Sequence, residues 1–149
     1  MIYKHRFIKR IPKCFLINLC KNVIEDSSDR QVYHKSIIER DAYWKQYNFN
    51  ESQQNMLMDK LKDTSRIRVA KIRHVILHQI HSNIESHRDE ICKSSVLIPV
   101  KFCKSIMFYD ENRSINFEYG CYYVFNDFEL HGLDVPRYSN NLIISIDFE

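Results

Sequence analysis

Glycine is almost absent from this chain, with two glycines among 149 residues. The loops that hold nucleotide phosphates, GxxxxGKS/T and GxGxxG, need several glycines at fixed spacing, and neither pattern occurs here. This scarcity argues against a nucleotide site built on a glycine-rich loop.

Long apolar runs are absent as well. The sequence contains no stretch of about 18 apolar residues, which is the length needed to cross a membrane as a helix. The apolar segment 14–20 is short and lacks the small-residue cleavage site of a signal peptide. We therefore expect no membrane partner.

The five cysteines contain no CxxC pair: they are Cys14, Cys20, Cys92, Cys103 and Cys121. An odd number without that spacing is typical of reduced thiols, which predicts a cytoplasmic protein. Cys103 and Cys121 lie in apolar stretches, where cysteine usually acts as a small hydrophobic residue.

The net charge is only +3 at pH 7, which does not indicate a nucleic-acid partner. Basic residues nevertheless gather before the first acidic residue, Glu25. We interpret them as a solvent-exposed face, and a weak contact with an anionic partner is the alternative. They are Lys4, Arg6, Lys9, Arg10, Lys13 and Lys21.

The length predicts one domain over residues 1–149, with a change of pattern near residue 66. Residues 1–65 look mixed and partly helical. A short helix is expected over 18–25 and a stronger one over 51–62, where Leu57 and Leu61 share a face.

Asn50 is placed to cap the second of these helices. Just before it stands an aromatic cluster of Tyr43, Trp44, Tyr47 and Phe49. We interpret the cluster as packing between a helical layer and a sheet, and a wall of a substrate pocket is the alternative.

Residues 66–149 consist of short strand-like runs separated by turn signals. Such spacing predicts a sandwich or barrel, and a jelly roll of the cupin kind can hold a metal at its mouth. The fold class is therefore mostly β with N-terminal helices. The expected strands lie within 66–84 and over 95–102, 105–109, 114–119, 121–125 and 141–148.

His87-Arg88-Asp89, followed by the distant His131, is the most informative motif. Alternate residues of a strand point to one face, so His87 and Asp89 can converge on one ion. Two histidines and a carboxylate form the facial triad of non-haem Fe(II) oxygenases. We therefore predict that His87, Asp89 and His131 are the catalytic metal ligands.

The residues around this motif resemble the Fe(II)/2-oxoglutarate-dependent oxygenases, and within them the aspartyl/asparaginyl β-hydroxylase-like group. The similarity covers about residues 66–149. It comprises the His-x-Asp motif at 87–89, LIPV at 97–100, GCYYVFNDFELH at 120–131 and NLIISID at 141–147.

The resemblance implies a double-stranded β-helix, with Fe(II) as cofactor and 2-oxoglutarate and O2 as cosubstrates. It implies a hydroxylase that acts on an amino-acid side chain, either free, in a peptide or in a small natural product. The alternative from another class is a cupin-like binding protein without catalytic activity.

One departure from the family concerns the distal carboxylate of 2-oxoglutarate. The family places an arginine ten residues after the distal histidine, and this sequence has Asn141 there. Arg137 is the nearest replacement, and Lys101 and Lys104 are rivals, since a guanidinium or ammonium binds carboxylates. We take Arg137, Lys101 and Asn141 as the cosubstrate-binding candidates.

Other polar residues have plainer interpretations. His74 and His78 have metal-like spacing for a helix, but their stretch is predicted to be a strand without further ligands. Asp127 and Glu129 would share a face with His131 on a strand, and Asp127 could orient a ligand. Asp147 would fix the final strand, and an ordinary exposed carboxylate near the chain end is the alternative. Arg88 would point away from the metal and could still contact the substrate at the rim.

Overall fold

The structure is a computed structural model that describes residues 1–27, 30–34, 43–62, 71–88 and 94–149. Two helices, α1 (Lys13–Asp26) and α2 (Glu51–Leu61), accompany two antiparallel sheets. The strands are β1 (Tyr3–Arg6), β2 (Arg30–His34), β3 (Tyr43–Asn48), β4 (Ile72–Ile80), β5 (Ile84–His87), β6 (Ser94–Lys101), β7 (Met107–Asp110), β8 (Ser114–Asn116), β9 (Cys121–Phe125), β10 (His131–Asp134) and β11 (Asn141–Phe148).

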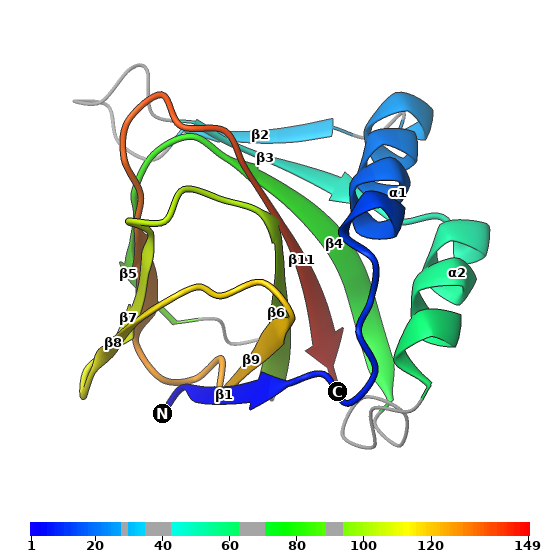
Figure 1. Cartoon of the computed structure of the whole chain (residues 1–149). Coiled ribbons are helices and arrows are strands. Elements are labelled where there is room, and N and C mark those ends of the chain that lie inside the picture. Colours follow the sequence, from blue (N-terminus) through cyan, green and yellow to red (C-terminus); the bar gives the residue numbers. More distant parts are fainter. Residues whose placement is uncertain (28–29, 35–42, 63–70, 89–93) are drawn as a thin grey trace.

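The larger sheet has the order β1-β9-β6-β11-β4-β3-β2, and the smaller one has the order β5-β10-β7-β8. From β4 onward the chain passes back and forth between them: β4, β6, β9 and β11 lie in the larger sheet, and β5, β7, β8 and β10 in the smaller. This winding is a double-stranded β-helix, or jelly roll, as the sequence predicted. In Figure 1 the labelled strands of the smaller sheet face the long strands β4 and β11.

The larger sheet has two different faces because its residues alternate. On β11, Leu142, Ile144 and Ile146 belong to a core that includes residues of both helices. Ile143, Ser145 and Asp147 point the other way, toward a cavity between the sheets. Ser145 and Asp147 therefore face the interior that could hold a ligand.

Both helices cover the outer face of the larger sheet (Figure 1). On α1, the buried residues Leu16, Leu19, Cys20 and Val23 are spaced as one helical stripe. This stripe extends the helix beyond the predicted 18–25. The predicted Asn50 cap is confirmed, because Asn50 and Gln53 form a reciprocal capping box at the start of α2.

The aromatic cluster divides between the two faces of β3 and its end. Trp44 lines the cavity, whereas Tyr47 and Phe49 belong to the core on the helix side. Both interpretations of the cluster therefore hold for part of it: Tyr47 and Phe49 pack against the helical layer, and Trp44 forms a pocket wall. The side chain of Tyr43 lies outside the described part.

Five of the expected strands correspond to β6, β7, β8, β9 and β11, and β4 lies within the expected 66–84 region. The expected boundary near residue 66 lies outside the described residues. The sequence did not indicate β1, β2 or β3, all of which extend the larger sheet. β1 reads YKHR and becomes a strand by pairing with β9.

Two of the N-terminal basic residues hold β1 against the turn that precedes β9. Lys4 and Arg6 both bind the carboxylate of Glu118, with Arg6 Nη2 2.8 Å from Glu118 Oε1. Hydrogen bonds from Lys4 and Arg6, together with their charges, lower the pKa of Glu118 to about 2. These two basic residues have an acidic partner within the chain itself.

The cysteines of the described residues, Cys14, Cys20, Cys103 and Cys121, are free thiols, and Cys92 lies outside the described part. Burial raises the pKa of the Cys20 thiol to about 12, so Cys20 stays protonated in the core. Cys121 is buried as predicted for a small hydrophobic residue. Neither helix of the described chain is long and apolar enough to span a membrane.

Adjacent residues of α2 provide a test of this packing. Leu57 is 0% exposed and Met56 is 45% exposed. We expect Leu57→Ala to lower the free energy of unfolding by about 2–5 kcal/mol, because it leaves a cavity in the helix-side core. Met56→Ala, the matched control, should change it by less than about 0.5 kcal/mol. Urea denaturation measures both, and equal effects would contradict this assignment of the buried face.

Candidate active site

His87 and His131 lie side by side although 43 residues separate them in the sequence. His87 ends β5 and His131 begins β10, and the two residues are partners in the antiparallel register. Their ring centroids are 4.5 Å apart, and both side chains line the same cavity. The smaller sheet thus brings together two of the three predicted metal ligands.

Backbone carbonyls fix the tautomer of both rings. His87 Nδ1 lies 2.7 Å from the carbonyl oxygen of Glu85, and His131 Nδ1 lies 2.8 Å from that of Glu129. A carbonyl only accepts hydrogen bonds, so each Nδ1 carries the proton. The lone pair of each neutral ring is therefore on Nε2, as in metal sites where the second ring nitrogen donates to a carbonyl.

Aromatic side chains hold the His131 ring in place. The Phe125 ring centroid is 4.7 Å from that of His131, and the Phe108 ring is stacked on it at 6.4 Å. His131 itself is only 7% exposed. Packing of this kind restricts the imidazole to one orientation.

The third predicted ligand, Asp89, lies outside the described residues. Within residues 1–27, 30–34, 43–62, 71–88 and 94–149, no group of three or more His, Cys, Asp or Glu side chains could hold a metal. The nearest carboxylate in register, Asp110 opposite His131, accepts hydrogen bonds from the backbone N–H groups of Ile2, Asn112 and Arg113. The role of Asp89 stays a prediction.

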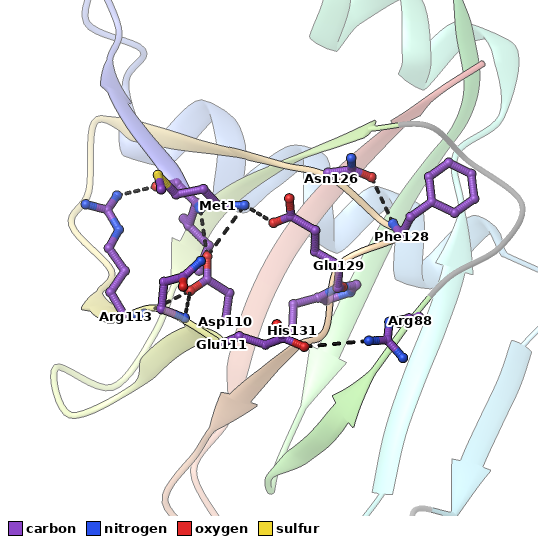
Figure 2. A network of polar contacts seen from close by, with 11 residues as sticks. Met1, Arg88, Asp110, Glu111, Arg113, Asn126, Phe128, Glu129 and His131 are labelled. Carbon is purple, nitrogen blue, oxygen red and sulfur yellow. Dashed lines mark hydrogen bonds and ion pairs between the residues drawn. The ribbon is translucent and has the colours of Figure 1, made fainter.

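Burial opposes the ionisation of Asp110, but these three backbone hydrogen bonds and the Met1 amine outweigh it and keep its pKa below the usual range. Asp110 therefore ties the N-terminal residues to the smaller sheet. Figure 2 shows it beside Met1 and Arg113, at one side of His131.

The rim of the site carries two further charged contacts (Figure 2). Arg88 Nη2 lies 3.6 Å from Glu111 Oε1, and the Glu129 carboxylate binds the Met1 amine. Glu129 does not share a strand face with His131, since β10 begins only at His131. The Asn126 side chain accepts a hydrogen bond from Phe128 N, and this turn replaces the expected strand.

The cavity has a volume of about 210 Å³ and lies between the two sheets. Its walls are mainly aliphatic and aromatic, with Ile76, Leu97, Phe108, Phe125 and Ile143 among them. Besides His87 and His131, polar groups interrupt this apolar surface in two clusters. No lysine or arginine of the described chain lines the cavity.

The first polar cluster contains two acids joined by one hydroxyl. Ser95 Oγ lies 2.7 Å from Asp127 Oδ2 and 2.6 Å from Asp147 Oδ1. A hydroxyl has one hydrogen to donate, so Ser95 shares it between the two carboxyl groups. His74 Nδ1 lies 3.8 Å from Asp147 Oδ2. Sequence reasoning assigned Asp127 and Asp147 to separate minor roles and missed Ser95.

The second polar cluster is a hydrogen-bond chain from Trp44 through His78 to Ser145. Trp44 Nε1 donates to His78 Nδ1 at 2.8 Å, and His78 Nε2 lies 2.7 Å from Ser145 Oγ. Gln46 Nε2 lies 3.5 Å from the same Nδ1. The predicted β-strand around His78 is confirmed, and His78 contacts an indole and a hydroxyl. Alternation along 141–148 would have identified Ser145 as a residue facing the same side as Asp147.

The three candidate residues for cosubstrate binding lie outside the cavity between the sheets. Arg137 is exposed in the loop before β11, and Lys101 is exposed at the end of β6. Asn141 is 0% exposed, and its amide binds Cys103 N, Ile80 O and Ser139 Oγ. None of the three lines the cavity.

Gly132 allows the two histidine strands to approach each other. A Cβ at this position would lie 2.8 Å from the Ile84 carbonyl oxygen and 2.5 Å from the Tyr109 hydroxyl oxygen. Gly132→Ala should therefore push β5 away from β10 and lower the free energy of unfolding by about 1–3 kcal/mol. Urea denaturation measures this loss. Tyr109→Phe should not restore stability, because the backbone clash remains, and full rescue by it would contradict the assignment.

No protein-family model matches the sequence, and no curated protein matches it either. Solved structures do match the fold. An oxidoreductase of the 2OG-Fe(II) oxygenase family from Burkholderia pseudomallei is 12% identical, with a TM-score of 0.64 over 89% of this chain and 78% of that one. A prolyl hydroxylase from Trichoplax adhaerens, solved with a peptide fragment of hypoxia inducible factor, is 12% identical, with a TM-score of 0.68 over 99% and 82%.

A predicted oxalate decarboxylase from Thermotoga maritima is 8% identical, with a TM-score of 0.54 over 83% of this chain and 94% of that one. Identities this low establish the fold alone, and the narrower resemblance to aspartyl/asparaginyl β-hydroxylases stays a prediction. The chain therefore has the double-stranded β-helix fold of the 2OG-Fe(II) oxygenases, which a predicted decarboxylase also has.

Proposed function

We propose that this protein is an Fe(II)/2-oxoglutarate-dependent dioxygenase that hydroxylates an amino-acid side chain. The observation that carries the proposal is the pair His87 and His131, whose Nδ1 protons are held by backbone carbonyls and whose Nε2 lone pairs can bind a metal. The fold shared with 2OG-Fe(II) oxygenases supports it.

His87 and His131 would hold Fe(II) together with Asp89, two residues beyond His87. Two imidazoles and one carboxylate leave coordination positions open for 2-oxoglutarate and O2. When bound, iron and 2-oxoglutarate supply the oxidation of an unactivated C–H bond. The chain itself orients these groups and keeps water away from them with the apolar walls of the cavity.

The substrate is proposed to be an amino-acid side chain, free, in a peptide or in a small natural product. A fold neighbour that was solved with a peptide supports the peptide form. The charged residues at the rim, Arg88 and Glu111, lie near His131 and are placed to meet such a chain (Figure 2).

A cupin-like binding protein without catalytic activity is the second candidate. It is favoured by one observation: no lysine or arginine of the described residues lines the cavity, although 2-oxoglutarate carries two carboxylates. Iron binding followed by 2-oxoglutarate binding would decide for the enzyme.

The decisive experiment is an anaerobic Fe(II) titration, with and without 2-oxoglutarate. We expect the wild type to bind one iron and to develop a visible charge-transfer absorption band when the 2-oxo acid chelates it. His87→Ala, Asp89→Ala and His131→Ala should each weaken iron binding by more than about 100-fold, because a lost ligand costs more than a lost supporting hydrogen bond.

His81→Ala is the matched control. The Nδ1 atom of His81 also contacts a backbone carbonyl, that of Ser139 at 2.9 Å, but His81 does not line the cavity. Its substitution should leave iron binding unchanged. A wild-type protein that binds no Fe(II), or alanine variants that bind it as well as the wild type, would refute the proposed metal centre.

A further inference from the structure

Hydrogen-bond donors fix the charge of His78. The indole N–H of Trp44 can only donate, so His78 Nδ1 must be an unprotonated acceptor. The ring is then neutral and carries its proton on Nε2, which donates to Ser145 Oγ at 2.7 Å. A protonated His78 would set two N–H groups against each other at Nδ1.

This arrangement leaves the Ser145 hydroxyl hydrogen available for the cavity. Ser145 Oγ accepts from His78, so its own O–H is directed to another acceptor. Ser145 is 5% exposed, lines the cavity and faces the same side of β11 as Asp147. The amide of Gln46, which also lines the cavity, lies beside the same His78 nitrogen.

The strand register gives the distance along β11 between Ser145 and the level of His87 and His131. Asp147 pairs with Ser95, Ser95 pairs with Phe125, and the Phe125 ring is 4.7 Å from that of His131. The histidine pair therefore lies at the Asp147 level of the larger sheet. Ser145 is two residues further along β11, or about 6.7 Å. A five-carbon chain spans on the order of 5 Å, given ordinary C–C bond lengths.

A carboxylate at the Ser145 level would meet neutral donors. Asn141, at the family's arginine position, uses its amide on Cys103, Ile80 and Ser139. No lysine or arginine from the described segments lines the cavity. Hydrogen bonds from neutral groups to a carboxylate are still charge-assisted and therefore strong.

We propose that Ser145, held by His78 and Trp44 and assisted by Gln46, binds the distal carboxylate of a five-carbon 2-oxo diacid in place of the missing arginine. The inference rests on the proposed function, because it assumes that the other end of the diacid chelates a metal at His87 and His131. Ser145 is then a specificity-determining residue that selects a diacid over a 2-oxo monoacid.

The chain carries its own reporter for this proposal. Trp44 is the only tryptophan in the sequence, and it lines the cavity and donates to His78. Its fluorescence can be followed during anaerobic titration of the Fe(II)-loaded protein. The two probes are 2-oxoglutarate and 2-oxopentanoate, which has the same five-carbon chain without the distal carboxylate.

We expect Ser145→Ala to weaken 2-oxoglutarate binding by about 10- to 100-fold, the effect of losing a hydrogen bond to a charged group. The same variant should bind 2-oxopentanoate with unchanged affinity. Ser145→Thr keeps the hydroxyl and should keep the preference for the diacid, which provides a second variant if Ser145→Ala does not fold. Ser114→Ala, an exposed serine on β8, is the matched control.

Three results would overturn the proposal: equal 2-oxoglutarate affinity in Ser145→Ala and wild type, equal weakening of both probes, or weakening by Arg137→Ala or Lys101→Ala instead. Failure of the proposed function is seen separately, because the wild type would then bind no Fe(II) before either probe is added. Iron binding without any response to 2-oxoglutarate would overturn this proposal and leave the metal centre standing.

Discussion

The pairing of β5 with β10 is the contact on which the candidate site depends. It sets His87 opposite His131, and backbone carbonyls then fix the tautomer of both rings. The pairing is close because position 132 has no side chain: the Ile84 carbonyl and the Tyr109 ring occupy the space that a Cβ would need. In a chain with only two glycines, one of them is used here.

The alternation of β11 organises the rest of the molecule around that pair. Leu142, Ile144 and Ile146 bury one face under the helices, which frees the opposite face to carry polar side chains at Ser145 and Asp147. The helix-side core stabilises the sheet without depending on the cavity side. Because the two faces of β11 have separate roles, side chains on the cavity face can be substituted while the residues packed under the helices keep the fold.

Two polar clusters give the cavity its chemical character. The Ser95 cluster joins the acids Asp127 and Asp147, and the Trp44–His78–Ser145 chain presents neutral donors deeper inside. In an apolar cavity such groups interact strongly with whatever they contact, since little water screens them. A ligand of this cavity would have to match donors and acceptors at two levels along β11, and a short polar molecule with functional groups at both ends would do so.

Local sequence determined a sandwich or barrel, most of its core strands and the capped helix α2, because periodicity, turn residues and the Asn50–Gln53 pattern act over short distances. The resemblance to the 2-oxoglutarate-dependent oxygenases narrowed this class to the jelly roll. It also singled out His87 and His131. Only the tertiary structure decided that β1 and β3 complete the larger sheet and that Trp44 and Ser145 meet at His78. These contacts join residues 28 to 121 positions apart, and such distant partners leave no periodic signal in the chain.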